Sequence, residues 1–335
     1  MVSDKSYLLH AKGVRAVRRV LVPIDGSDLS QSIIPDARRL AGPDGELVLI
    51  RDASEPGYDP DDAVTAGVEG YEESENYLDA LATTLRADGA RVLTQTFVMG
   101  TPERAILEAI GIFRPDMVAC ATHARHGLDR LMRGSVAWTV LTHSPVPVLL
   151  RHPRHLSAML EGDHWYRRRI LVPLDGSALA EKALPLAETL AAEWNASVCL
   201  ARVVSDAPLP TPLGFGAPVY APEIDHRAEM RDADEYLEAI AKPLRGEVHR
   251  ATVLGNPIPT LKALVDDWWI TDIVMATHGR TGFSHVLLGS VTDALLQTLD
   301  IPIVAVPALA AAPHSDAAEP AAVEPVPEVV GANRA

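Results

Sequence analysis

Short runs of apolar residues alternate with longer amphipathic segments along most of the chain. Apolar runs bounded by turn residues are typical of strands buried in a parallel sheet, and amphipathic segments are typical of the helices that cover it. In the first half, the runs predict strands at residues 20–24, 47–50, 92–98, 117–121 and 146–150. In the second half, they predict strands at 170–174, 198–204, 248–254, 273–276 and 303–306, with helices opening near Ser177, Ala221, Pro257 and Ser290.

Five strands alternating with helices in each half predict an α/β fold. The expected architecture is two doubly wound, Rossmann-like, five-stranded parallel sheets, one in each half and each with the strand order 3-2-1-4-5. In such a sheet ligands bind beyond the carboxyl ends of the strands, where the strand order reverses. Polar and small residues after the first and fourth strands are therefore the candidates for function.

The two halves of the chain are copies of one another. RRVLVPIDGS, which starts at Arg18, matches RRILVPLDGS, which starts at Arg168, and ATHARHG at Ala121 matches ATHGRTG at Ala276. The shift is 150 residues for the first pair and 155 for the second. A nearly constant shift indicates two repeated domains rather than a solenoid. We expect a first domain over 14–151, a linker over 152–167, a second domain over 168–307, and a disordered Ala/Pro/Glu tail over 308–335.

Composition narrows the choice of partners. The 45 acidic residues outnumber the 30 basic ones, for a formal charge of −15, which disfavours nucleic acid and anionic membranes as partners. The sequence shows neither a signal peptide nor an apolar stretch long enough to span a membrane. The two cysteines, Cys120 and Cys199, lie in apolar runs and read as core residues of a cytoplasmic protein.

The second copy carries a glycine-rich segment after its fourth strand. Gly279 is followed by nine residues and then by Gly289 and Ser290, which open a helix. Glycines let backbone amides approach a phosphate closely, and a helix N-terminus presents unpaired N–H groups and partial positive charge. Asp175, after the first strand of this copy, is placed to accept hydrogen bonds from ribose hydroxyls. The sequence therefore predicts a nucleotide site.

Together the motifs VP-x-DGS, ATHGR and LLGSV resemble those of the universal stress protein family, over about residues 14–150 and 167–307. The resemblance implies that Pro173, Val203 and Met275 flank an adenine, that Asp175 holds the ribose, and that Gly279, Gly289 and Ser290 hold phosphates. The implied nucleotide site comprises Pro173, Asp175, Val203, Met275, Ala276, His278, Gly279, Gly289, Ser290 and Val291.

The first copy departs further from the family pattern than the second. The second copy has Ala276 in place of the first motif glycine, whereas the first copy has alanine at both places, Ala121 and Ala124. An added methyl group obstructs close approach of a phosphate and disfavours a left-handed backbone. We therefore rank the first copy as a weaker site, made of Pro23, Asp25, Ala121, His123, Gly134, Ser135 and Val136.

Structural explanations compete with these functional ones. Asp25 and Asp175 stand in DGS sequences, which suit a turn followed by an N-capping serine. The histidines near the fourth strands lack carboxylate or cysteine neighbours at a familiar ligand spacing, so no metal site is expected.

Three functions stay open on the sequence alone. The first is a stress-response regulator that binds ATP or a related adenine nucleotide, together with Mg²⁺ held by a carboxylate such as Asp175. The second is an interaction module that binds no nucleotide, and the third is a weak ATPase. No activated nucleophile and no Walker-type lysine is recognisable, so at most slow hydrolysis is expected. The resemblance also implies that the two domains pair through their fifth strands, and a homodimer of whole chains stays open.

Overall fold

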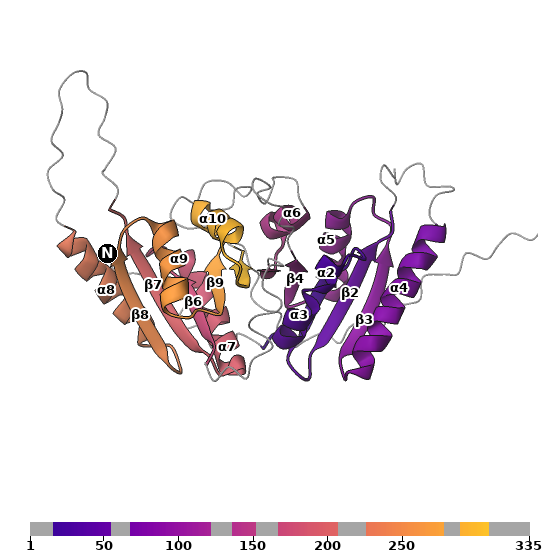
Figure 1. Cartoon of the computed structure of the whole chain (residues 1–335), viewed down its shortest axis with the longest axis horizontal. Coiled ribbons are helices and arrows are strands. Elements are labelled where there is room, and N and C mark those ends of the chain that lie inside the picture. The colour runs from indigo at the N-terminus through magenta and orange to yellow at the C-terminus, as the bar shows by residue number, and fades with distance from the viewer. Residues whose placement is uncertain are drawn as a thin grey trace, which may run out of the picture.

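The computed structural model describes residues 16–54, 68–121, 136–151, 167–206, 226–277 and 289–307. It shows the predicted α/β fold in both halves (Figure 1). The predicted tail at 308–335 and nearly all of the predicted linker, residues 152–166, lie outside the described residues.

The first domain contains five strands with helices between them. Its strands are β1 (Arg19–Pro23), β2 (Glu46–Asp52), β3 (Arg91–Phe97), β4 (Met117–Ala121) and β5 (Val148–Arg151). Its helices are α2 (Asp28–Gln31), α3 (Ile34–Ala41), α4 (Val68–Ala87), α5 (Pro102–Phe113) and α6 (Val136–His143).

The second domain repeats this plan. Its strands are β6 (Arg169–Pro173), β7 (Ser197–Val204), β8 (Val248–Leu254), β9 (Asp272–Ala276) and β10 (Ile303–Val306). Its helices are α7 (Leu184–Trp194), α8 (Arg227–Ala241), α9 (Pro257–Asp267) and α10 (Ser290–Thr298), with a short 3-10 helix, η4 (Ala180–Ala183), before α7. The strands start and end within about two residues of the predicted positions. Most of them are buried apolar runs, whereas the outermost strands β3 and β8 contain polar residues and are partly exposed.

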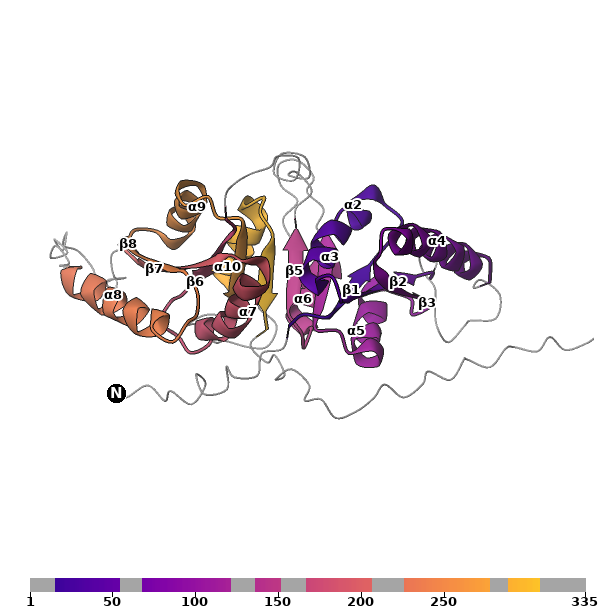
Figure 2. The same cartoon turned by 90° about the horizontal axis from the view of Figure 1, so that it is seen from below.

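All ten strands form one sheet, in the order β3-β2-β1-β4-β5-β10-β9-β6-β7-β8. Within each domain the strands are parallel and follow the order 3-2-1-4-5. The two domains meet where β5 pairs with β10 in antiparallel register, Leu149 facing Val304 (Figures 1 and 2). The structure thus joins the two expected sheets edge to edge, at the strands where the sequence analysis expects the domains to meet.

The core has two layers, one on each face of the sheet. Successive strand residues point to opposite faces, so Val20 and Val22 pack in one layer and Leu21 in the other. Helices α3, α4, α7 and α8 cover the first layer, and α5, α6, α9 and α10 cover the second. Each layer contains residues of both domains, so the hydrophobic core continues from one domain into the other. No helix within the described part of the chain has the length and apolar character needed to cross a membrane.

The two buried thiols provide a test of this core. Burial raises the pKa of Cys120 to about 12 and that of Cys199 to about 11, and a thiol reacts as its thiolate. We expect that neither thiol reacts with a disulfide reagent at pH 8 in the folded protein and that both react after denaturation. Colorimetric thiol titration measures this, and one rapidly reacting thiol per folded chain would contradict the packing described here.

Candidate functional site

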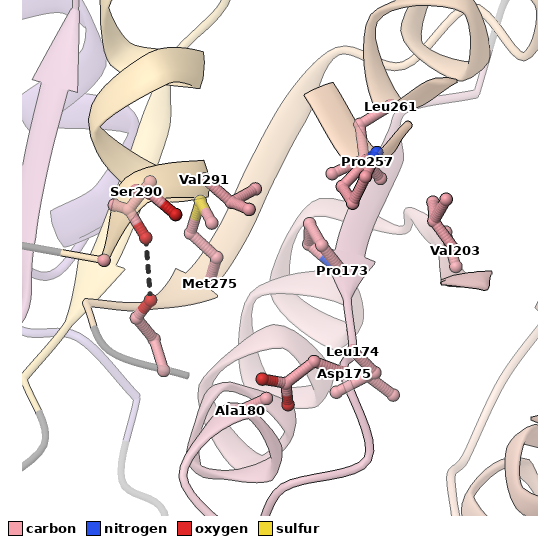
Figure 3. A pocket seen from close by; sticks show the side chains of 14 residues that line it. Pro173, Leu174, Asp175, Ala180, Val203, Pro257, Leu261, Met275, Ser290 and Val291 are labelled. Carbon is pink, nitrogen blue, oxygen red and sulfur yellow. Dashed lines mark hydrogen bonds between the residues drawn. The ribbon is translucent and has the colours of Figure 1, made fainter. Parts of the chain in front are cut away.

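A cavity of about 240 Å³ lies in the second domain, at the carboxyl ends of β6, β7 and β9 (Figure 3). Strand β6 pairs with β7 on one side and with β9 on the other, so the strand order reverses here. The N-terminus of α10 and one side of α9 complete the wall. The lining residues are Pro173, Leu174, Asp175, Ala180, Ala201, Val203, Pro257, Leu261, Met275, Ala276, Gly289, Ser290, Val291 and Thr292.

Asp175 reaches this cavity from the tight turn that follows β6. The backbone N–H of Ser177 donates a hydrogen bond of 2.9 Å to Asp175 Oδ1, and the N–H of Ala180 donates one of 3.1 Å to Ser177 Oγ. The structural explanation of the DGS sequence is therefore correct for the turn but not for the helix cap, because the N-cap residue of η4 is Leu179. It does not exclude the functional one, because the half-buried Asp175 also lines the cavity (Figure 3).

The first turn of α10 lies on the opposite side of the cavity. Gly289 is the N-cap residue, with an extended backbone, and has no side chain to cap the helix. Its own N–H donates to the carbonyl oxygen of Thr277 at 2.8 Å, and Thr292 Oγ donates to the carbonyl oxygen of Ala276 at 3.2 Å, the dashed line in Figure 3. These bonds tie the start of the helix to the end of β9. The first N–H groups of a helix have no partner within it, so this end of α10 suits an anion.

The remaining walls are apolar. Ala201 and Val203 alternate along β7 and face the cavity, and Pro257 and Leu261 stand one helical turn apart on α9. Met275 and Val291 approach from the other side (Figure 3). An apolar slot that opens toward a carboxylate and a helix N-terminus has the chemistry to hold a flat base with a polar, anionic extension.

Eight of the ten residues predicted for this site line the cavity. His278 and Gly279 lie outside the described residues. The sequence analysis missed the outer wall on α9, Pro257 and Leu261, although their spacing of four residues on a predicted helix marks them as neighbours on one face. It also missed Leu174, Ala180, Ala201 and Thr292.

A model of the universal stress protein family matches residues 16–152 and again residues 167–307, which together are most of the chain. The chain belongs to the universal stress protein family.

Individual members resemble this chain at a lower level of identity. A universal stress protein from Methanocaldococcus jannaschii is 26% identical over 150 residues, covering 45% of this chain and 87% of the relative. One from Mycobacterium bovis is 24% identical over 242 residues, covering 70% of this chain and 76% of the relative. The crystal structure of a universal stress protein from Archaeoglobus fulgidus has a TM-score of 0.60 at 21% identity, covering 86% of this chain and 96% of that chain. That structural likeness shows that the fold is shared.

The first universal stress domain has the corresponding strand ends. Pro23 ends β1, Ala121 ends β4 and Val136 starts α6, as expected, while His123, Gly134 and Ser135 lie outside the described residues. Asp25 Oδ1 accepts hydrogen bonds from the N–H and the hydroxyl of Ser27, at 2.9 and 2.6 Å, so the turn is kept here as well.

The two domains differ at Asp52, which the sequence patterns did not single out. Pro23 pairs with Ile50 in the first domain and Pro173 pairs with Ala201 in the second, so Asp52 is equivalent to Val203. Its Oδ1 accepts hydrogen bonds from the N–H of Ser54 at 3.2 Å, the hydroxyl of Ser54 at 2.7 Å and the N–H of Met99 at 3.1 Å. A carboxylate thus stands where the second domain has an apolar wall. Comparing the two aligned repeats position by position would have found it.

Two glycines with a left-handed backbone, Gly176 and Gly246, should respond differently to replacement by alanine. Gly176 has φ +83°, and an added Cβ would lie 3.0 Å from the guanidinium of Arg202, which stacks on Tyr236 at 4.8 Å. Gly246 has nearly the same φ, +85°, but an added Cβ meets nothing within 4 Å. We expect Gly246→Ala to lower the free energy of unfolding by about 1–2 kcal/mol through backbone strain, and Gly176→Ala to lower it further. Urea unfolding measures the free energy of unfolding of both variants. Equal losses would show that the Arg202 side chain moves away from the added methyl group without cost.

Proposed function

We propose that the second domain binds ATP or a related adenine nucleotide in the cavity between β6, β7, β9 and α10, and that the protein acts as a stress-response regulator rather than a fast catalyst. The observation that carries the proposal is the combination, in one cavity, of an apolar slot, the Asp175 carboxylate and the uncapped N-terminus of α10. Each of the three matches one part of a nucleotide. The second domain's membership in a family with this motif points in the same direction.

The adenine would lie between Val203, Met275 and Pro173, where contact with apolar side chains removes it from water. Asp175 would accept hydrogen bonds from the ribose hydroxyls, and the N–H groups after Gly289 would donate to phosphate oxygens, assisted by the exposed Ser290 hydroxyl. Bound Mg²⁺ would offset phosphate charge, and carboxylate oxygen is the kind of ligand that this ion prefers.

The residues around the proposed phosphate position favour a regulatory role over catalysis. The described lining residues include no lysine, arginine or histidine, and enzymes that transfer phosphoryl groups rely on such cations. One oxygen of Asp175 already accepts the turn hydrogen bond. We therefore expect at most slow hydrolysis, in a cytoplasmic setting that agrees with two free buried thiols.

For the first domain, a specific observation favours the other candidate function, an interaction module without nucleotide. Asp52 stands at the place of an adenine-flanking residue, and burying a base against this carboxylate would cost desolvation of its charge. We propose that the chain binds one nucleotide, in the second domain.

Copying the first domain's carboxylate into the second domain tests this proposal. We expect Val203→Asp to weaken ATP affinity at least tenfold, because the carboxylate removes an apolar wall and repels the phosphates. Isothermal titration with Mg²⁺ and ATP measures it. The matched control is Asp52→Asn in the first domain, which should leave affinity unchanged. Wild-type protein that binds no ATP at millimolar concentration would overturn the proposal.

Asp175 can be tested without breaking its turn. Asn keeps the Oδ1 acceptor for Ser177 but loses the negative charge, so Asp175→Asn keeps the turn bond and weakens the bond to ribose. Because a hydrogen bond to a charged group contributes about 1.5–3 kcal/mol, we expect affinity to fall by tenfold or more. Asp25→Asn is the matched control in the first domain. Equal affinities of the two variants would place Asp175 in the turn alone.

A further inference from the structure

Five charged side chains meet at the junction between the two domains, away from the cavity. Asp36 and Arg39 on α3 and Arg151 on β5 belong to the first domain, and Arg168 and Asp272 to the second. We call them the junction cluster. Arg39 Nη2 lies 2.9 Å from Asp36 Oδ1 and 3.2 Å from Asp272 Oδ1, so one guanidinium joins a carboxylate of each domain.

The other members complete the cluster. Arg151 pairs with Asp36, and Arg168 Nη1 lies 2.9 Å from Asp272 Oδ2. Arg39 also stacks over the ring of Trp194, in the second domain, at 4.6 Å, and Arg168 approaches the same ring at 5.6 Å. Arg39 of the first domain therefore contacts both a carboxylate, Asp272, and an aromatic ring, Trp194, of the second domain.

The cluster is buried, and its burial is unfavourable for the charged forms. Asp272 is 1% exposed, Asp36 5% and Arg151 7%. Burial raises the pKa of both Asp36 and Asp272 above its ordinary value, even though the neighbouring arginines lower it. Within the described residues, Arg39 Nε and Trp194 Nε1 are also buried without a hydrogen-bond partner. Stability is therefore a poor explanation for these charges, since buried ion pairs often contribute no more than apolar residues of similar size.

The junction cluster has no counterpart on the other side of the junction. Leu149 and Val304 are equivalent positions and also face each other, so the junction has local two-fold geometry. The residues equivalent to Asp36, Arg39, Arg151 and Asp272 are Leu186, Thr189, Val306 and Met117. Of these, Leu186, Val306 and Met117 are buried in the apolar core layer. The buried ion pairs are therefore confined to one half of the junction. On the other half apolar residues replace most of them, although Arg18, the equivalent of Arg168, is kept there and interacts electrostatically with Glu193 of the second domain.

We propose that the junction cluster determines which domains pair, so that a first domain accepts a second domain and rejects another copy of itself. Two first domains would place Arg39 of each against Met117 of the other, leaving the arginine without its second carboxylate. Two second domains would bury Asp272 of each against Leu186 and Thr189 of the other. Asp272 would then lose Arg39 and keep only Arg168 as a partner from the cluster. Leaving a buried charge without its partner is costly, so only the mixed pair satisfies every member.

The test starts with the full chain cut in place. A protease site inserted within residues 152–166, in the predicted linker, separates the two halves after purification and removes the high local concentration that the linker imposes. Native mass spectrometry then distinguishes first–second, first–first and second–second pairs by mass. For the wild-type sequence we expect first–second pairs alone, also after partial denaturation and refolding. Appearance of like pairs in the wild-type sample would overturn the proposal.

A symmetric junction should lose this selectivity. The variant D36L/R39T/R151V/D272M places at each position the residue that the other domain already carries there, so volume and pattern suit the fold. We expect a statistical mixture of the three pairs, with a melting temperature equal to or above that of the wild type. Mixed pairs alone would again overturn the proposal. The control is Glu46→Gln, which removes the 2.8 Å ion pair with Arg19 inside the first domain and should leave pairing unchanged.

A transplanted acid keeps the proposal testable if the symmetric variant fails to fold. D116T/M117D gives the first domain the Thr–Asp pair that the second domain carries at 271–272, so that Arg39 of one copy can meet the new carboxylate of another. In the cut chain we expect first–first pairs to appear. A folded D116T/M117D protein, judged by circular dichroism, that forms none would contradict the assigned role of the acid.

Discussion

The site depends on the parallel pairing of β6 with two different neighbours. Because β7 lies on one side of β6 and β9 on the other, the connections after β6 and β9 turn to opposite faces of the sheet and leave a crevice between them. Asp175 enters this crevice from the end of β6 and the α10 N-terminus from the segment after β9. Any sequence with this pairing opens such a crevice, so side chains decide what the crevice accepts.

The two domains show how side chains make that decision on one backbone plan. Both keep the Asp-Gly-Ser turn with the same hydrogen bond from serine N–H to Asp Oδ1, at 2.9 Å in each. They differ at the wall, where Val203 offers an apolar surface and Asp52 offers a carboxylate bound to Met99 and Ser54. The shared turn is therefore a property of the fold, and the wall residue separates the two crevices chemically.

The same divergence appears at the junction. Edge strands with free backbone groups invite pairing with any similar edge, and β5 and β10 bury these groups against each other. Backbone pairing alone would not distinguish one copy of this domain from another, because the two-fold geometry allows each. A buried ionic cluster on one half, replaced mostly by apolar residues on the other, provides a difference in side-chain chemistry that backbone hydrogen bonds lack.

The sequence by itself determined the ten strands, the duplication, the family and eight of the residues that line the cavity. Strands buried in a parallel sheet are recognisable as local apolar runs, and the motif residues directly follow such runs. It did not reveal Pro257 and Leu261 as a wall, Asp52 as an obstacle or the contact of Arg39 with Asp272. A position-by-position comparison of the repeats finds Asp52. The other two depend on which face of a helix turns inward and on residues 233 positions apart meeting across two domains. Such meetings leave no local signal, since the partners share neither a strand nor a helix, and only the folded chain brings them within hydrogen-bond distance.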